Sequence, residues 1–407
     1  MQTPPKFCLC CKSEVGEIMD LGRQPLANNL LINSDDDYEI YDLKLMGCLN
    51  CGHLQLSEFI DPDLLFKNYF YASGTSRTLT TYFNWLATSL KTLCESSNYQ
   101  TILEIASNDG AFLDALKNSD LNVIGVDPAL NLNVTARRKG HTIYDGFWPE
   151  VAPQLKRKFH IIIAQNVFAH NPDPVRFLQV AADLLEDDGV IVIQTSQAEM
   201  ILHGQFDTIY HEHHSFFTPS SFKKISTLCD LKINNIFITN IHGGSYLAVL
   251  SKKIQNFNKY FTSDWITKEV DLEQDFDRGQ FEKLMKSFSL NSFEVVEKTR
   301  EVTEKYRDQG FRVVFVGAAA KAIVFLNFSK IKTDIIIDEA ELKIGKYIPK
   351  INLKVEEFSV VKGIKSPILF VIAAWNFREE IKSKLKAIRP DNNDQYLNYF
   401  PEFSLSN

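Results

Sequence analysis

Residues 101–110 read TILEIASNDG, an apolar run with the composition of a buried strand that ends in a short polar loop. The next residues, AFLDALK, have a helical pattern, and a second apolar run, NVIGVD, occupies 122–127. Further strand-like runs at 160–165 and 189–194 are separated by a helix-like segment at 172–186. Because strands and helices alternate here, this part of the chain is predicted to form a doubly wound, mainly parallel α/β sheet.

Polar residues follow the predicted strands at their C-terminal ends. In sheets of this kind, ligands bind beyond these ends, near the point where the strand order reverses. Gly110 lets the backbone approach an adenosine-type ligand closely, and Asp127 lies where a carboxylate can accept hydrogen bonds from both ribose hydroxyls. The loop is acidic and lacks the glycines or lysine of a phosphate cradle, so it favours a cationic cofactor over a diphosphate. The residues expected to rim one crevice are Glu104, Asn108, Asp109, Gly110, Asp127, Asn166 and His170.

The chain of 407 residues is too long for one ordinary core. We predict three domains, over residues 1–70, 71–255 and 256–407. The formal net charge is −7 and no long Lys/Arg run is present, so nucleic acid is not an expected partner. The N-terminus lacks an apolar stretch like that of a signal peptide, and no run approaches the ~18 apolar residues that span a bilayer. A cytoplasmic protein with no membrane partner is therefore expected.

Five of the seven cysteines lie in the first 51 residues. Cys8 and Cys11 form one CxxC pair, and Cys48 and Cys51 form a second pair about 40 residues later. This spacing is typical of a closed, tetrahedral four-thiolate zinc site, in which the metal has a structural role. The alternative is that these are reduced cysteines that only pack in the interior. Two further groups are near in sequence: Cys10 is a spare thiol, and His53 is a less favoured substitute for Cys51.

Residues 209–214 read IYHEHH and hold three of the nine histidines. The segment is either a metal site, a proton-handling site or a polar edge without chemistry. On a helix, metal ligands usually come at i and i+4, and on a strand His211 and His213 share one face while His214 takes the other. The crowding therefore disfavours a single ion held by all three. His214 and His211 are also compatible with solvated or structural roles.

The last third of the chain contains a second, smaller α/β pattern. The runs RVVFVGAAAK, TDIIIDE and SPILFVIAAW alternate with helix-like segments, after a polar connector with helical spacing. Lys321 either meets a phosphate at a helix N-terminus or is simply a good helix former. Earlier in the chain, His242 precedes two glycines in a tight turn that enters a strand, where it borders a substrate site or has only a conformational role.

Several segments, in this order, resemble one family. They span residues 8 to about 382 and read CLCCKSEVGEIMDLGRQPLANNLL, CLNCGHLQL, YASGTSRTLTTYF, LEIASNDGAFL, NVFAHNPDP, FDTIYHEHHSFFT, IHGGSYLAVL, VVFVGAAAKAIVFLN and AAWNFREEI. The chain resembles the three-domain sugar C-methyltransferases of deoxysugar biosynthesis, which methylate C3 of nucleotide-linked 4-keto sugars. The resemblance implies a class I methyltransferase Rossmann-like domain that binds S-adenosylmethionine, flanked by a small N-terminal zinc-binding domain and a C-terminal Rossmann-like α/β domain that helps to hold the nucleotide sugar.

The resemblance also implies roles for individual residues. The family's Tyr-x-Glu-His motif falls on Tyr210, Glu212 and His213, with the histidine as general base and the other two as its assistants. His170 matches a further active-site histidine. The C-terminal segment GAAAKAIVFLN departs from the family pattern, which leaves open which sugar nucleotide fits. The implied cofactor contacts are Glu104, Asn108, Asp127 and Asn166.

Transfer of a methyl group to a sugar carbon requires prior removal of a proton, because a sugar C–H is not a nucleophile. Next to a ketone, deprotonation gives an enolate, so the site needs a base and a donor near the developing oxyanion. His213 meets the first need, and a tyrosine, a lysine or a protonated histidine meets the second. The expected protein is a monomeric sugar C-methyltransferase; the alternatives are O- or N-methylation of a related sugar nucleotide or phosphorylated metabolite, and a non-catalytic zinc-containing binding protein.

Overall fold

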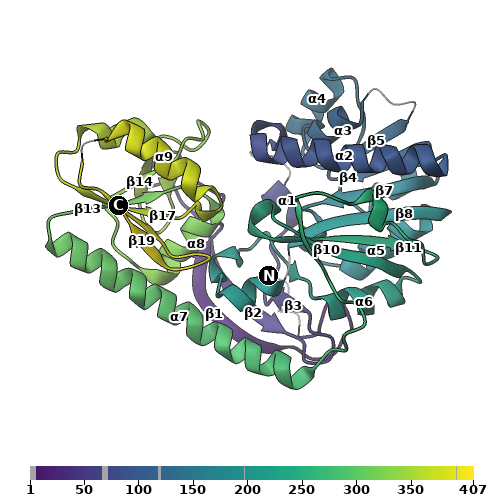
Figure 1. The fold of residues 1–407 in the computed structure, drawn as a ribbon, viewed down its shortest axis with the longest axis horizontal. Helices are drawn as coiled ribbons and strands as arrows, with labels where there is room; N and C mark the ends of the chain where they lie inside the picture. The colour runs from purple at the N-terminus through teal and green to yellow at the C-terminus, as the bar shows by residue number, and fades with distance from the viewer. Residues whose placement is uncertain (1–5, 67–71, 118–120, 197, 391) are drawn as a thin grey trace.

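The computed structural model describes residues 6–66, 72–117, 121–196, 198–390 and 392–407. Three β-sheets lie side by side, and the N-terminal sheet sits between the other two (Figure 1). The predicted boundary between residues 70 and 71 falls outside the described residues, as does the first residue of YASGTSRTLTTYF. The two domain boundaries remain predictions. No helix in the described part of the chain is both long enough and apolar enough to cross a membrane.

The N-terminal sheet has four antiparallel strands in the order β1-β2-β3-β9. Its last strand comes from the segment that directly follows IYHEHH, far from the others in sequence. A short helix, α1 (Pro62–Phe66), follows β3. The strands are β1 (Gly16–Pro25), β2 (Ile40–Gly47), β3 (Leu54–Leu56) and β9 (Ser215–Phe216).

The central sheet has eight strands in the order β12-β10-β11-β8-β7-β4-β5-β6. The strands from β8 to β6 run parallel, and β11 pairs antiparallel with both of its neighbours. The strand order reverses between β4 and β7, because β5 follows on one side of β4 and β7 on the other. The strands are β4 (Thr101–Ile105), β5 (Asn122–Asp127), β6 (Thr142–Asp145), β7 (Phe159–Gln165), β8 (Leu185–Ser196), β10 (Lys232–Thr239), β11 (Ser245–Ser251) and β12 (Ile266–Glu269).

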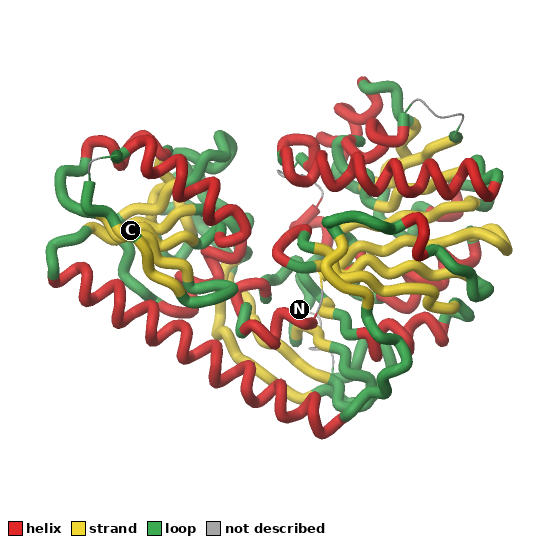
Figure 2. The backbone as a smooth tube through the Cα atoms, in the orientation of Figure 1, coloured by secondary structure: helices red, strands yellow, loops and turns green. Residues whose placement is uncertain are grey.

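Helices cover both faces of this sheet (Figure 2). The four strand-like runs of the sequence all form strands, and the order is that of a class I methyltransferase domain, so the predicted fold class is confirmed. The helix expected over 172–186 is shorter, because it ends at Asp183 and β8 begins at Leu185. The helices are α2 (Arg77–Ser97), α3 (Ala111–Leu116), α4 (Leu130–Arg138), α5 (Pro174–Asp183) and α6 (Pro219–Leu228).

A long helix, α7 (Arg278–Asp308), runs along the edge of the molecule to the C-terminal sheet (Figure 1). That sheet has the order β15-β16-β14-β13-β17-β18-β19, with parallel pairing from β16 to β18 and antiparallel edges. Two helices, α8 (Ala320–Ser329) and α9 (Arg378–Ile388), belong to it. The strands are β13 (Arg312–Val316), β14 (Ile335–Ile337), β15 (Tyr347–Ile348), β16 (Leu353–Glu356), β17 (Ile368–Ile372), β18 (Gln395–Asn398) and β19 (Ser404–Ser406).

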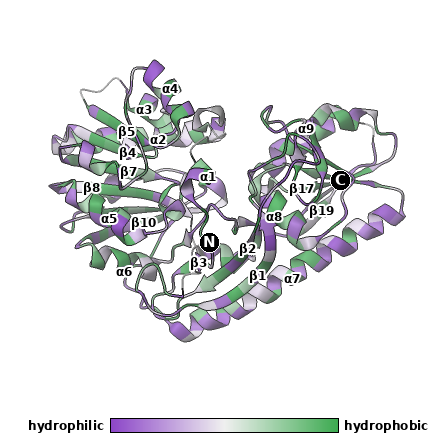
Figure 3. Cartoon of the chain, turned by 180° about the vertical axis from the view of Figure 1, so that it is seen from behind, coloured by the Kyte–Doolittle hydropathy of each residue, from purple (hydrophilic) through white to green (hydrophobic). Residues whose placement is uncertain are grey.

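The segment before IYHEHH packs in a core that the N-terminal and C-terminal domains share. Phe206, on the 3₁₀ turn η5 (Phe206–Thr208), is fully buried against Phe325, Phe328 and Phe400 of the C-terminal domain. The same apolar cluster contains residues of β2 and β3. Apolar residues line the strands of the sheets, whereas α7 alternates between polar and apolar residues (Figure 3). The position of IYHEHH is thus fixed by domains on either side of it.

Candidate active site and zinc site

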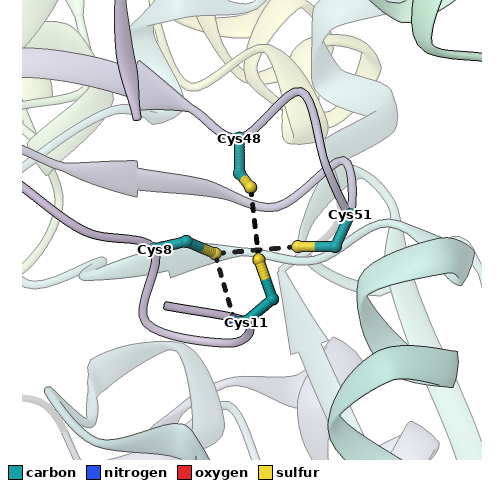
Figure 4. A group of neighbouring side chains, drawn as sticks. All are labelled: Cys8, Cys11, Cys48 and Cys51. Carbon is teal, nitrogen blue, oxygen red and sulfur yellow. Dashed lines mark hydrogen bonds between the residues drawn. The ribbon is translucent and has the colours of Figure 1, made fainter. Parts of the chain in front are cut away.

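The four predicted zinc ligands come together in the N-terminal domain (Figure 4). Their Sγ atoms all lie within 4.8 Å of one another, with Cys8 and Cys51 3.6 Å apart and Cys11 and Cys48 3.4 Å apart. Four thiolates at about 2.3 Å from a tetrahedral zinc ion are roughly 3.8 Å apart, so the cluster fits this metal. His53 does not belong to this group of metal-ligand atoms. Its Nε2 lies 3.2 Å from the Ser215 hydroxyl.

A cavity of about 530 Å³ opens at the C-terminal ends of β4, β5 and β7, beside the reversal of strand order. Its volume lies in the range of small-molecule and cofactor sites. Four of the predicted crevice residues line it: Asn108, Asp127, Asn166 and His170. Asn108 and Asn166 both have left-handed backbone angles, with φ of 52° and 51°, which turn the chain sharply where each strand ends.

The other three predicted crevice residues lie behind the cavity wall. The Glu104 carboxylate is buried and accepts a 3.4 Å hydrogen bond from Gln165; its burial holds the pKa well above the ordinary value. The Asp109 carboxylate accepts hydrogen bonds from the backbone N–H of Gly74. Gly110 has φ of 76° and packs closely, since a Cβ there would lie 2.9 Å from the His141 ring. These residues shape the loop.

Asp127 is the best-placed acceptor in the larger cavity. It ends β5, and its two carboxylate oxygens accept backbone hydrogen bonds from Asn108 at 2.9 Å and Ala129 at 2.7 Å. These bonds fix the carboxylate plane and leave further lone pairs for a ligand. Burial raises the pKa of Asp127 to about 6, although the two backbone N–H groups oppose this rise. The carboxylate is therefore ionised at neutral pH.

The lining of the larger cavity fits a nucleoside. Trp148 and Phe177 supply aromatic wall. On the polar side, Gln165 Oε1 and Gln194 Nε2 are buried and have no hydrogen-bond partner among the described residues. The two amide side chains line the cavity, although these particular atoms are buried within its wall. The cavity thus fits S-adenosylmethionine, whose ribose would be held by Asp127.

A second, smaller cavity of about 130 Å³ adjoins the larger one, and Asn166 and His242 line both. Tyr210 and His213 line the smaller cavity. The two residues of IYHEHH that are predicted to be catalytic, Tyr210 and His213, therefore line a chamber next to the candidate cofactor site. Backbone from the turn that contains His242 completes the same wall, which places this residue between the two chambers.

The hydrogen bonds of His213 specify its tautomer. Nδ1 lies 3.1 Å from the Thr208 carbonyl oxygen, which can only accept, so Nδ1 carries the proton. Nε2 therefore has the free lone pair and accepts from the Tyr210 hydroxyl at 3.0 Å. Burial is the main cause that lowers the pKa of His213 well below 6.5, and nearby His170 lowers it further. The imidazole is neutral at pH 7 and can accept a proton at Nε2.

The rest of IYHEHH has other neighbours. The ring of His211 packs edge-on against Tyr41, and that of His214 lies 4.7 Å from Phe59. Both rings are buried, so neither is solvated. The three histidine rings thus point to three different surroundings, and in the described part of the chain the grouped metal-ligand atoms belong to the four cysteines.

Glu212 and His170 make hydrogen bonds that hold the segment in place, and of the two only His170 lines the larger cavity. The Glu212 carboxylate accepts a 2.5 Å hydrogen bond from Asn28, and its backbone carbonyl accepts from His170 Nδ1 at 2.7 Å. The His170 ring lies 5.0 Å from the His213 ring. Burial lowers the pKa of His170 to about 4, so this ring is neutral as well. Glu212 lines neither cavity; its contacts orient the segment.

The C-terminal domain completes the smaller cavity with Lys321 and Asn376. Lys321 Nζ lies 3.9 Å from the centre of the Trp375 ring, and Trp375 Nε1 donates a 3.0 Å hydrogen bond to the buried Asp207. Sequence reasoning did not assign Asp207, Trp375 or Asn376 to the site. Their only signal was that they lie within FDTIYHEHHSFFT and AAWNFREEI, two of the segments that carry the family resemblance.

Three family models match the chain in order. They are described as "Putative zinc binding domain" over residues 8–66, "Methyltransferase domain" over 74–233 and "C-methyltransferase C-terminal domain" over 240–401. The chain therefore carries, in this order, the three domains that these models describe. The predicted resemblance is thereby confirmed at the level of the domain organisation.

Known proteins are similar to the chain over different shares of its length. The C-methyltransferase NovU of Streptomyces niveus is 25% identical over 408 residues, which cover 97% of this chain and 95% of NovU. Among solved structures, magnesium protoporphyrin IX methyltransferase of Synechocystis PCC 6803 with bound SAM is 13% identical with a TM-score of 0.34, over 43% of this chain and 82% of that chain. An S-adenosylmethionine-dependent methyltransferase of Clostridium acetobutylicum is 12% identical with a TM-score of 0.35, over 42% and 91% of the two chains.

Proposed function

We propose that this C-methyltransferase uses S-adenosylmethionine to methylate C3 of a nucleotide-linked 4-keto deoxysugar, with His213 as the general base. The observation that carries the proposal is the pair of adjoining cavities. The larger one has the acceptor groups and aromatic wall of a nucleoside site, the smaller one holds His213 and Tyr210, and Asn166 and His242 border both.

The smaller cavity has the chemistry that a carbon acid needs. S-adenosylmethionine, when bound, would supply an electrophilic methyl group on a sulfonium, and Asp127 and Asn166 of the larger cavity would hold it. The C3–H bond of the keto sugar breaks, its proton goes to His213 Nε2, and the electron pair forms the enolate. The Thr208 carbonyl stabilises the resulting imidazolium, because it accepts from Nδ1–H in both charge states.

Tyr210 takes part in the same step. Its hydroxyl donates to His213 Nε2 in the structure, so this bond must open, or relay the proton, when the substrate loses C3–H. Because Tyr210 lines the smaller cavity, its hydroxyl is also within the space where the enolate oxygen develops. The neutral state of His213 at pH 7 favours a base over an acid in this first step.

Solvent deuterium exchange at the sugar carbon, measured without methyl donor, tests the proposal. The wild-type protein is expected to exchange C3–H of a thymidine-, guanosine- or cytidine-linked 4-keto sugar and to methylate it once S-adenosylmethionine is added. His213→Ala is expected to lose both activities while its calorimetric affinity for S-adenosylmethionine is unchanged. His214→Ala is the matched control, because that ring belongs to the same segment but lines neither cavity.

The outcomes separate the alternatives. Methyl transfer without any carbon exchange would mean O- or N-methylation. No binding of S-adenosylmethionine or S-adenosylhomocysteine at millimolar concentration would remove the methyltransferase mechanism altogether. Full turnover of His213→Ala would reject His213 as the base and leave the substrate class standing.

A further inference from the structure

Lys321 reaches from the C-terminal domain into the cavity that holds His213 and Tyr210. It is the second residue of α8, and the side chain is half-buried. Among the described residues, no hydrogen bond or ion pair engages its ammonium group. Its three N–H donors are therefore available to a ligand in the smaller cavity.

The surroundings of Lys321 fix the ammonium without using these donors. The ring of Trp375 lies 3.9 Å from Nζ, within the range of a cation–π contact. Trp375 is itself held by Asp207, whose Oδ2 accepts from Nε1 at 3.0 Å. Asp207 is wholly buried, and its Oδ1 has no hydrogen-bond partner in the described part of the chain. This carboxylate thus acts on Lys321 as a nearby counter-charge.

The pKa of Lys321 lies close to neutral pH. Burial lowers the pKa of Lys321 to about 8, although the negative charge of Asp207 opposes the fall. Asp207 is ionised under these conditions, because its own pKa is raised only to about 6. At pH 7 the smaller cavity therefore combines a neutral imidazole with a desolvated cation.

We propose that Lys321 is a catalytic residue: its ammonium group holds the carbonyl oxygen of the acceptor and stabilises the negative charge that forms there when His213 removes the adjacent proton. This inference rests on the proposed function. When the C–H bond breaks, its electron pair forms the carbon–carbon double bond of the enolate, and the carbonyl π electrons move to oxygen beside Lys321. A preorganised cation at that point stabilises the transition state more than the ground state.

The position of Lys321 beside the base favours the carbonyl group over a phosphate as its partner. Lys321 and His213 line the same small cavity. A carbonyl oxygen and the hydrogen on its neighbouring carbon are close in any ketone. The base and the cation must accordingly line one small chamber, as His213 and Lys321 do.

Deuterium exchange with Lys321→Met tests the inference, since methionine keeps the length of the side chain and removes its charge. At saturating keto sugar, the exchange rate is expected to fall about 10²- to 10³-fold, the loss typical of one oxyanion donor. The affinity for S-adenosylmethionine and the melting temperature should be unchanged. Lys382→Met is the control, because Lys382 also lies over an aromatic ring, at 5.2 Å from that of Tyr396, but lines neither cavity.

The pH profile provides a readout that a structural role would not move. Exchange by the wild-type protein requires charged Lys321, so it should fall as the pH rises through about 8. Asp207→Asn removes the charge that raises this pKa, so the alkaline limb should move to lower pH. Both results together support the inference.

Three results would overturn it. The first is a wild-type exchange rate in Lys321→Met. The second is a higher KM for this variant with an unchanged saturated rate, which would indicate ground-state binding of a phosphate. The third is an alkaline limb of the pH profile that Asp207→Asn leaves in place. If the wild-type protein exchanges no keto sugar, the proposed function itself fails, and this outcome is distinct from the other three.

Discussion

Gly243→Ala should reduce catalysis more than a change of one methyl group on a surface turn normally does. Gly243 lies in the turn η6 (Ile241–Gly243) and has φ of 83°. A Cβ at this position would lie 2.6 Å from both Trp375 Cη2 and Asn376 Oδ1. Because Trp375 carries the contacts to Lys321 and Asp207, any shift that relieves the clash also moves the cation of the smaller cavity.

Gly310 permits a matched comparison. Its φ of 86° is almost the same, but nothing lies within 4 Å of a Cβ built there. The left-handed backbone costs alanine about 1 kcal/mol at either position, so this contribution cancels between the two variants. What remains for Gly243→Ala is the overpacking, at about 1–3 kcal/mol. If the strain is relieved at the active site, kcat/KM should be about 5- to 150-fold lower than in Gly310→Ala.

Transfer of labelled methyl to the accepted keto sugar measures kcat/KM, and calorimetry with S-adenosylmethionine measures donor affinity in the same preparations. We expect a loss of kcat/KM confined to Gly243→Ala, with a similar donor affinity in the two variants and a lower melting temperature in Gly243→Ala because of the overpacking. Equal kcat/KM for Gly243→Ala and Gly310→Ala would refute the idea that contact between this turn and Trp375 holds the smaller cavity in shape.

Two further predictions concern the cofactor site and the zinc site. Affinity for S-adenosylmethionine should fall up to about tenfold for each pH unit below 6, because the pKa of Asp127 is raised to about 6 and only the ionised form accepts hydrogen bonds from both ribose hydroxyls. In Asp127→Asn, calorimetry across pH 5–7 should show weak binding without this pH dependence. If the variant kept the same loss of affinity at acidic pH, the role of the carboxylate would be contradicted. Cys48→Ser should lower the zinc content below one per chain. It should also reduce the free energy of unfolding in urea by more than about 4 kcal/mol, as loss of a structural metal does. A stable variant with full zinc content would show that Cys48 is not a ligand.

Local sequence patterns were sufficient for most of the fold. The runs TILEIA, NVIGVD, HIIIAQ and GVIVIQ become β4, β5, β7 and β8, because short apolar runs separated by helical patterns have few other solutions than a parallel sheet. The pattern was less reliable at the start of β8. Residues 185–188 read LEDD, and three successive acidic residues are unusual in a buried strand, yet Leu185 already pairs with Phe159.

The edge of the sheet at which the cavity opens was predictable from the sequence, but the direction of each side chain was not. Glu104 and Asp127 both lie near the C-terminal end of a buried strand, and only Asp127 lines the larger cavity. A strand buried on both faces gives no polar alternation from which to choose the face. Glu104 instead meets Gln165 of β7, a contact set by strand order rather than by local sequence.

Contacts between domains were beyond the reach of local patterns. Asp207 and Trp375 are 168 residues apart, and the packing of the η5 turn against the C-terminal domain, including that of Phe206, brings them together. In the sequence Lys321 was equally compatible with a phosphate site and with a helix position of no special role. The structure shows that it lines the chamber that contains His213.

The position of IYHEHH depends on the domains on either side of it. Its next residues form β9, which pairs with β3 of the zinc-binding domain, so that Leu54 lies opposite Phe216 and His53 contacts Ser215. Its preceding residues pack in the C-terminal core through Phe206. The central domain contributes the larger cavity, while its neighbours fix the position of His213. A metal bound by the four cysteines would therefore influence the position of His213, because β3, the strand next to the second cysteine pair, pairs with the strand that follows His213.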